Sequence, residues 1–253
     1  NYGRDGWNGS TRGGAGVLDT CTNSYFGGCT FSTNYVHRAC NLYAYGGTLY
    51  FTACKGARIE GCRFNAGRST YVSAQSNKYD LFGQVCYFLN SSVSMLDSVF
   101  DGAGTGGSLG GGAVDVSGGT FGMTNVLFVG TQKCWGVGNK GGAVSAANCT
   151  FAGISTNTGD RAFAAYVQNT SGTASFRNCI LWDVPCGAAY KTAGDDPAFA
   201  RCAAEYAIEG SKNLLLTASP FTDAEAGDYT LFNGSPCVGA GNAKGITGPT
   251  DLA

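Results

Sequence analysis

The sequence is poor in the residues that most metal sites, nucleic-acid surfaces and membrane segments require. It has one histidine, His37, and two methionines, and 13% of its 253 residues are charged, with a formal net charge of -1. A chain without a basic excess has no stripe that could follow a phosphate backbone, which argues against nucleic acid as a partner. No apolar run approaches 18 residues, so we expect no transmembrane segment.

Proline is scarce as well, with 5 residues against 41 glycines. The glycines follow no every-third-residue period, which excludes collagen, and 43% hydrophobic residues exclude a disordered chain. The length suits one or two domains with a sizeable core. Because the chain opens at Asn1 without a signal-peptide pattern and ends without a capping element, we expect a processed piece of a longer protein.

Twelve cysteines are present, and no two of them are separated by only two to four residues. Zinc ribbons and fingers need such close pairs, so we expect no structural metal and no cofactor. The even number favours disulfides in an oxidising compartment, and the alternative is buried free thiols that pack as small hydrophobic groups. The pairing stays open; the candidate disulfide cysteines are Cys186, Cys202, Cys237, Cys21 and Cys40.

Five N-glycosylation sequons are compatible with secretion through a eukaryotic route. The candidate glycosylation sites are Asn8, Asn90, Asn148, Asn169 and Asn233.

Two kinds of repeat run along the chain. Gly-Gly-Ala-Val begins at Gly111 and again at Gly141, thirty residues later, and a looser copy begins at Gly46. A second motif places Cys, Ser or Val two residues before a large apolar residue. Its large apolar residues are Phe31, Phe64, Phe100, Phe128, Phe151 and Leu181, spaced by 33, 36, 28, 23 and 30 residues.

This spacing predicts an all-β fold, a right-handed parallel β-helix (β-solenoid) of about six or seven coils with an irregular C-terminal closing segment. Residues 1–185 would form the coils, and residues 186–253 a closing coil and loop segment of the same domain. Alternation from the double glycine predicts two faces. Leu49/Phe51, Val114/Val116 and Val144/Ala146 would face inward, and Thr48/Tyr50, Ala113/Asp115 and Ala143/Ser145 outward.

The repeats resemble those of secreted parallel β-helix proteins. Gly-Gly-Ala-Val and Phe31-Ser-Thr-Asn34 look like the short repeats of chlamydial polymorphic outer-membrane proteins. Residues 176–253, with Phe176-Arg-Asn-Cys-Ile-Leu-Trp-Asp183 and Gly227-Asp-Tyr-Thr-Leu-Phe, resemble the closing segment of bacterial β-helix proteins with a choice-of-anchor domain. That resemblance implies a secreted or surface-anchored protein in which Asp196-Pro197 turns the chain and Ser235-Pro236-Cys237 covers the end of the helix.

Catalysis on such a fold needs several charged groups on one sheet face, as in glycoside hydrolysis by paired carboxylates. The outward positions supply Tyr50, Asp115 and Ser145, of which one is acidic. Asp195 and Asp196 precede a proline, which is typical of a turn.

Three further groups of residues have a structural interpretation as well as a functional one. Arg58, Glu60 and Arg63 form a charged group that could grip an acidic sugar or merely solvate a face. His37 has no identifiable catalytic partner and fits a surface or turn position. Tyr43, Tyr45 and Tyr50 alternate with the sheet period and could form an exposed stripe for sugars, or pack in the core.

The sequence therefore predicts a non-catalytic structural or adhesive scaffold that is extracellular or at the cell surface. Its partners would be other copies of itself, in a surface layer or filament, other cell-surface proteins, or polysaccharide. The alternative is a polysaccharide-binding or polysaccharide-degrading enzyme, a lyase or glycoside hydrolase of the pectate-lyase-like β-helix type.

Overall fold

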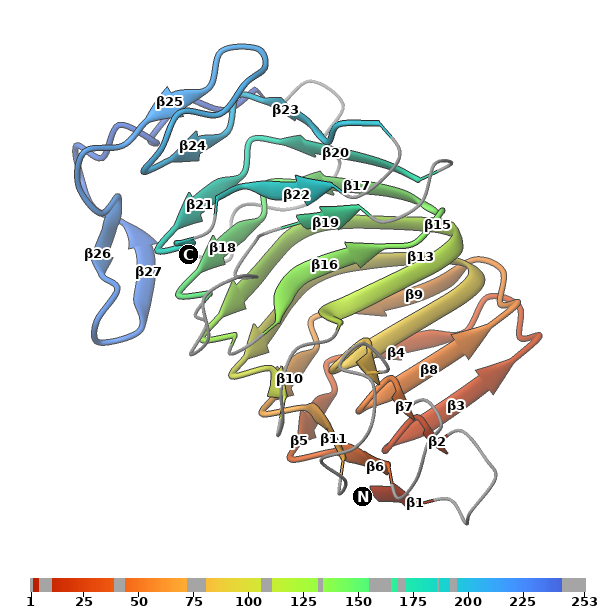
Figure 1. The fold of residues 1–253 in the computed structure, drawn as a ribbon. Coiled ribbons are helices and arrows are strands. Elements are labelled where there is room, and N and C mark those ends of the chain that lie inside the picture. Colours follow the sequence, from red (N-terminus) through yellow and green to blue (C-terminus); the bar gives the residue numbers. More distant parts are fainter. Residues whose placement is uncertain are drawn as a thin grey trace.

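Short strands with apolar side chains at alternate positions make up the regular structure of the chain (Figure 1). The computed structural model describes residues 2–4, 11–38, 44–71, 81–105, 111–131, 134–154, 165–167, 172–185, 187–191 and 195–242. This part of the chain contains no helix, and hence none that could span a membrane. The expected all-β class with parallel strands is confirmed.

The largest sheet has 18 strands, and its hydrogen-bonded pairs place them in three rows of parallel strands. The long strands β13 (Cys86–Asp101) and β15 (Gly112–Val129) bend and contribute to all three rows.

The first row also contains β3 (Gly16–Asp19), β8 (Leu49–Thr52), β16 (Trp135–Asn139), β19 (Ala165–Val167) and β22 (Ala189–Lys191). The second row contains β4 (Tyr25–Gly27), β9 (Ala57–Glu60), β17 (Ala143–Ala147), β20 (Thr173–Arg177) and β23 (Ala198–Ala200). The third row contains β5 (Thr30–Ser32), β10 (Arg63–Asn65), β18 (Thr150–Ala152), β21 (Ile180–Trp182), β24 (Ala203–Ala204) and β25 (Leu214–Leu215).

Two smaller parallel sheets and one antiparallel hairpin complete the fold. The four-stranded sheet contains β1 (Tyr2–Arg4), β6 (Tyr35–Arg38), β11 (Arg68–Tyr71) and β14 (Gly104–Thr105). The three-stranded sheet contains β2 (Thr11–Arg12), β7 (Ala44–Tyr45) and β12 (Leu81–Phe82). The hairpin consists of β26 (Phe221–Asp223) and β27 (Asp228–Leu231), which pack against the outer side of the third row through Phe221, Val129 and Ala152.

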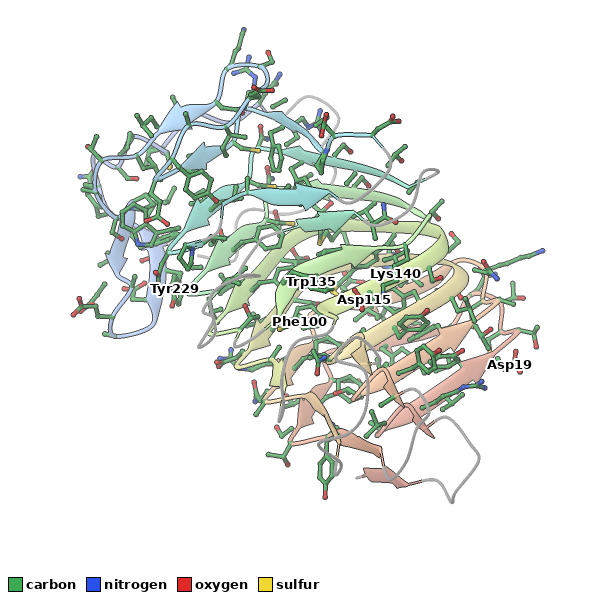
Figure 2. The ribbon with its side chains drawn as sticks, in the orientation of Figure 1. Asp19, Phe100, Asp115, Trp135, Lys140 and Tyr229 are labelled. Carbon is green, nitrogen blue, oxygen red and sulfur yellow. The ribbon has the colours of Figure 1, made fainter. Side chains whose placement is uncertain are left out.

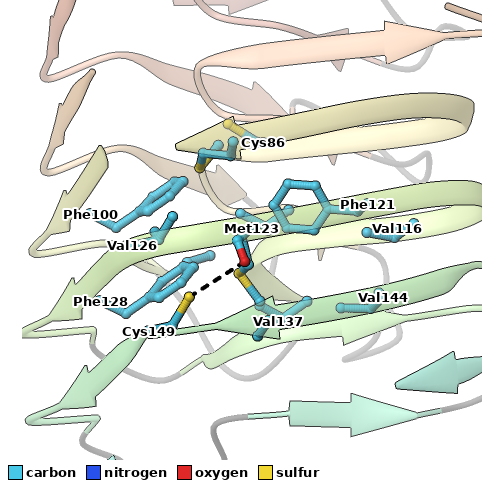
Figure 3. Packing of buried hydrophobic residues seen from close by; sticks show 14 of the residues in the cluster. Cys86, Phe100, Val116, Phe121, Met123, Val126, Phe128, Val137, Val144 and Cys149 are labelled. Carbon is cyan, nitrogen blue, oxygen red and sulfur yellow. Dashed lines mark hydrogen bonds between the residues drawn. The ribbon is translucent and has the colours of Figure 1, made fainter. Parts of the chain in front are cut away.

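The predicted ladder of large apolar residues is confirmed in the third row. Phe31 pairs with Phe64, and the pairing continues in register through Phe100, Phe128, Phe151 and Leu181. Neighbouring rings from Phe31 to Phe151 stack at centroid distances of 4.7 to 5.0 Å, nearly parallel to one another. The stack lies in one continuous core with the inward residues of the other two rows (Figure 3).

The double-glycine repeats do not stack as their spacing suggests. Val114 lies in the first row and pairs with Val137, whereas Val144 lies in the second row and pairs with Phe121. The looser copy does match, since Leu49 and Val114 both pair with Cys86. The two segments that are thirty residues apart therefore lie in different rows, one in the first and one in the second.

The inward residues are all buried as predicted, but the outward prediction holds only in the second row. Ala143 and Ser145 are exposed. The outward residues of the first row, Thr48, Tyr50, Ala113 and Asp115, are buried. The prediction of exposure was wrong there because further side chains cover the outer face of this row.

Candidate functional site

Asp115 is the acidic residue that sequence reasoning placed on an outer face, and it lies at the centre of a buried polar cluster. Figure 2 shows it beside Trp135 and Lys140, which β16 and the following turn supply. Its side chain is fully buried. A Cβ at Gly138, the register partner of Asp115, would overlap the carboxylate, so glycine leaves the space that the acid occupies.

Both carboxylate oxygens of Asp115 accept hydrogen bonds. The Gly112 N–H and the Trp135 Nε1–H each donate to Oδ1 at 3.1 Å, and the Gly83 N–H donates to Oδ2 at 2.8 Å. The Lys140 ammonium lies 4.0 Å from Oδ2. A carboxylate has about four acceptor sites, and the three N–H groups leave about one of them open. Because Asp115 is fully buried, a substrate proton cannot reach it.

Lys140 is held in a low-dielectric position. Its side chain is 16% exposed, and burial lowers its pKa below the usual value of 10.5, while the charge of Asp115 acts in the opposite direction. Trp135 and Lys140 were missed in the sequence, where a lone Trp and a lone Lys carry no motif. The one available signal was the small-residue run Trp135-Gly-Val-Gly-Asn139, which keeps Gly138 next to the acid.

The predicted tyrosine stripe is a packed cluster. The rings of Tyr50 and Tyr87 are stacked at 5.7 Å, and Tyr45 packs on Tyr87 at 4.8 Å. The Arg12 guanidinium lies 5.1 Å from the centre of the Tyr50 ring. Tyr50 is 3% exposed, and burial raises its pKa and that of Tyr87. Tyr43 lies outside the described residues, and the interpretation as an exposed stripe is wrong for Tyr50.

The exposed outer face of the second row is a shallow hollow of about 470 Å³. Its polar lining consists of hydroxyl groups that repeat from strand to strand, and Thr120 Oγ1 donates to Ser92 Oγ at 3.1 Å. The residues described as lining it include no carboxylate. Its exposed hydroxyl residues are Ser92, Ser94, Thr120, Ser145, Thr173 and Ser175.

A second cavity, of about 220 Å³, lies between the hairpin and the third row. Its polar wall includes Asn178, whose Nδ2 donates to Asn148 Oδ1 and to the Asn242 carbonyl, both at 3.0 Å. The Asn242 N–H donates back to Asn178 Oδ1 at 3.1 Å. Asn178 therefore holds the end of the described chain, near Asn242, against the third row through two hydrogen bonds.

The other charged candidates are scattered. Arg58 pairs with Glu60 at 2.8 Å, but Arg63 faces the third row and pairs with Asp101 at 3.0 Å, so the expected three-residue group does not form. Asp195 and Asp196 are exposed in the connection before β23. His37 lies in strand β6 and not in a turn.

The predicted modification sites fall into different environments. Asn90 and Asn233 are exposed. Asn148 is half-buried, and its Oδ1 accepts a hydrogen bond from Asn178. Asn8 and Asn169 lie outside the described residues. Among the candidate disulfide cysteines, Cys21, Cys202 and Cys237 carry free thiols, and Cys40 and Cys186 lie outside the described residues.

Most described cysteines follow a residue with a left-handed backbone and point into the core. Cys149, Cys179 and Cys202 stack directly before the successive third-row strands β18, β21 and β24. The thiol of Cys149 faces the Met123 carbonyl (Figure 3). Burial raises the pKa of Cys86, Cys134 and Cys179, which makes them poor nucleophiles.

The stacked thiols, the buried carboxylate of Asp115 and the hydroxyl-lined hollow are thus the chemically distinctive features of the described chain. Comparisons with protein-family models, with curated proteins and with solved structures gave no match.

Proposed function

We propose that this chain is a right-handed parallel β-helix of six or seven coils that serves as a non-catalytic structural or adhesive scaffold outside the cell. The coil assignment is supported by the phenylalanine ladder, in which each strand of the third row pairs with one 23 to 36 residues further along. Such lengths suit one coil of a solenoid.

The proposal that the chain is not catalytic rests on the burial and the hydrogen bonds of Asp115. A general base or nucleophile needs a free lone pair within reach of substrate, and a glycosidase needs two carboxylates. Three N–H groups donate to the two oxygens of Asp115, the Lys140 ammonium lies 4.0 Å from one of them, and the side chain is fully buried, so no substrate reaches it. Asp115 is therefore a structural clasp: it joins β15 to β16 through Trp135, and to the turn before β13 through Gly83.

An extracellular or surface location with self-association, or with other surface proteins as partners, follows from the resemblance of residues 176–253 to β-helix proteins with a choice-of-anchor domain. Among the described residues, β3, β4 and β5 each pair with another strand on one side only, which supports self-association because an unpaired strand edge can accept another strand. Val17 and Tyr25 on two of these strands are 53% and 62% exposed.

A second candidate function, polysaccharide binding, is favoured by the hydroxyl-lined hollow. Repeated hydroxyls on a flat sheet face could bind a chain of repeating sugars through many similar hydrogen bonds. The enzyme form of this alternative needs a free acid or base in the hollow, and the residues described there include no acidic group.

The test is an assay of the purified full chain against acidic and neutral polysaccharides, with release of reducing ends and of unsaturated products as readouts. We expect no turnover with any of them. Turnover that Asp115→Asn abolishes in a folded protein would overturn the non-catalytic proposal.

Scaffold and sugar binder are then separated by sedimentation of the chain alone and with insoluble polysaccharide. Concentration-dependent assembly without sugar supports the scaffold. Co-sedimentation that Ser145→Arg weakens, while the control Thr30→Arg on the third row does not, supports polysaccharide binding.

A further inference from the structure

Two pairs of cysteines are in register at the N-terminal edge of the stack. The bridge between Thr22 and Lys55 places Cys21 beside Cys54, and the Lys55 N–H donates to the Cys21 carbonyl at 2.9 Å. The same offset recurs at the next turn. There the Arg63 N–H donates to the Cys29 carbonyl at 2.8 Å, which places Cys29 beside Cys62.

The thiols of each pair face the same space. The Cys54 thiol reaches the Leu18 carbonyl of the neighbouring strand at 3.5 Å, and the Cys21 thiol lies 3.4 Å from the Asp19 carbonyl of that same strand. Burial raises the pKa of Cys54, and the Cys21 thiol beside it also acts on this pKa.

The second pair repeats this arrangement. The Cys62 thiol reaches the Phe26 carbonyl at 3.6 Å, and the Cys29 thiol lies 3.4 Å from the Gly27 carbonyl. Burial raises the pKa of Cys62 as well, and the Cys29 thiol acts on it in the same way.

The backbone spacing suits a covalent bridge. Neighbouring strands lie about 4.8 Å apart, and disulfides join Cα atoms about 4.4 to 6.8 Å apart. Each cysteine is next to a turn residue with a left-handed backbone: Thr20, Ala53, Gly28 or Gly61. A turn can absorb the small movement that closes the two sulfur atoms to bonding distance.

These pairs differ from the other stacked cysteines in access to solvent. Cys21 and Cys29, which lie in the connections between the edge strands β3, β4 and β5, are half-buried, whereas Cys149, Cys179 and Cys202 are 0% exposed. An oxidant in solution can therefore reach one member of each edge pair without unfolding of the chain.

We propose that Cys21–Cys54 and Cys29–Cys62 are disulfide sites that join the edge strands to the next layer. The oxidant is a small disulfide such as oxidised glutathione. The thiolate of the half-buried cysteine attacks it, forms a mixed disulfide and releases one reduced glutathione. The thiolate of the buried partner then attacks the protein sulfur of the mixed disulfide, forms the bridge and releases the second glutathione. The two protons lost by the protein thiols end on the two glutathione molecules, which are reduced as the cysteine pair is oxidised.

The bridges would act where the core is least covered. Leu18, Phe26 and Phe31, on the edge strands of the three rows, are only partly buried. Opening of these strands exposes the core without disturbing the middle of the stack, and a covalent link at each turn opposes that opening.

The experiment treats the reduced full chain with oxidised glutathione under native conditions and maps the product by mass spectrometry without reductant. Trypsin releases Cys62 within residues 59–63, and Cys21 and Cys29 together within residues 13–38. Chymotryptic cleavage after Tyr25 or Phe26 then separates these two. We expect the two predicted bridges to form, with Cys149, Cys179 and Cys202 still reduced.

Cys54→Ser is the matched variant. It should leave Cys21 at the mixed glutathione disulfide while the Cys29–Cys62 bridge forms as before, which also shows that the variant is folded. Bridging of Cys21 to Cys40, or oxidation of the 149–179–202 ladder at the same rate as the edge pairs, would overturn the proposal. So would a native wild-type chain that forms no bridge.

Discussion

Replacing Asp115 with alanine tests whether this acid is a structural clasp. The change removes the carboxylate that accepts from three N–H groups and that lies 4.0 Å from the Lys140 ammonium. An unpaired buried donor costs about 1–3 kcal/mol, and breaking a buried ion pair from one side costs about 3–5 kcal/mol. Because these terms overlap, we expect the free energy of unfolding to fall by about 4 kcal/mol, a large share of a typical 5–15 kcal/mol.

Urea denaturation followed by far-UV circular dichroism measures this loss. Lys140→Met in the Asp115→Ala background removes a buried cation that no longer faces the Asp115 carboxylate and should restore about 1 kcal/mol or more, whereas the same change in the wild-type chain should destabilise it. A loss below about 1 kcal/mol for Asp115→Ala, or no rescue by the second change, would refute the clasp.

The pH dependence gives a second check on the same variant. Burial lowers the pKa of Lys140 from 10.5 in the folded state, so the unfolded chain binds the proton more tightly and stability rises as pH approaches 10.5. Asp115 counteracts this lowering. Without Asp115 the pKa falls further, the rise with pH spans a wider range, and the Asp115→Ala variant should recover part of its deficit between pH 7 and pH 10. A deficit that is constant over this range contradicts the reasoning.

Three other changes have defined outcomes. Phe128→Ala removes a fully buried ring stacked on both sides and should lower the free energy of unfolding by about 3–5 kcal/mol; Phe31→Ala at the edge should lose less than half as much in the same urea assay. Lys212 has a φ of 59°, so Lys212→Gly relieves left-handed strain and should raise stability by up to about 1 kcal/mol; a loss in urea contradicts this. Secretion from a eukaryotic cell should place glycan on exposed Asn233 and not on Asn148, and glycosidase mass mapping at each site decides between them.

The phenylalanine ladder could be predicted because stacking demands the same residue type at the same position of each layer. The spacing between ladder residues varies, but Phe64, Phe100 and Phe128 remain in register. The residues that make one coil longer than the next lie outside the paired strands β10, β13 and β15. The turn before the ladder was predictable for a similar reason. Asn125, Asn148 and Asn178 have φ of 52° to 54°, a conformation that asparagine tolerates better than most residues.

The double-glycine repeat failed because a four-residue alternation defines a local strand and not its partner. The segments at Gly111 and Gly141 share letters and alternation, yet strand pairing assigns them to different rows. The burial of Asp115 could not be predicted either. Its neighbours in sequence place it on the outer side of the strand, but the groups that cover it come from Trp135 and Lys140, twenty or more residues away.

The polar groups at the turns fasten one layer to the next. Ser91 Oγ accepts the Cys54 N–H, Ser98 Oγ accepts the Cys62 N–H, and Asn213 Oδ1 accepts the Cys202 N–H. These hydroxyl and amide groups therefore maintain register and are not free for chemistry.

In the hydroxyl-lined hollow, exposed polar groups repeat from strand to strand on the outer face of the second row. A single neutral hydrogen bond contributes only about 0.5–1.5 kcal/mol, so no one serine can hold a partner there. Recognition would have to add many equal contacts along the strands, and loss of one hydroxyl, as in Ser94→Ala, would weaken binding about tenfold or less. A bulky Ser145→Arg would instead lift the partner from several positions at once. A surface of this kind suits a long repetitive partner, whether a polysaccharide or a second sheet, better than a small substrate.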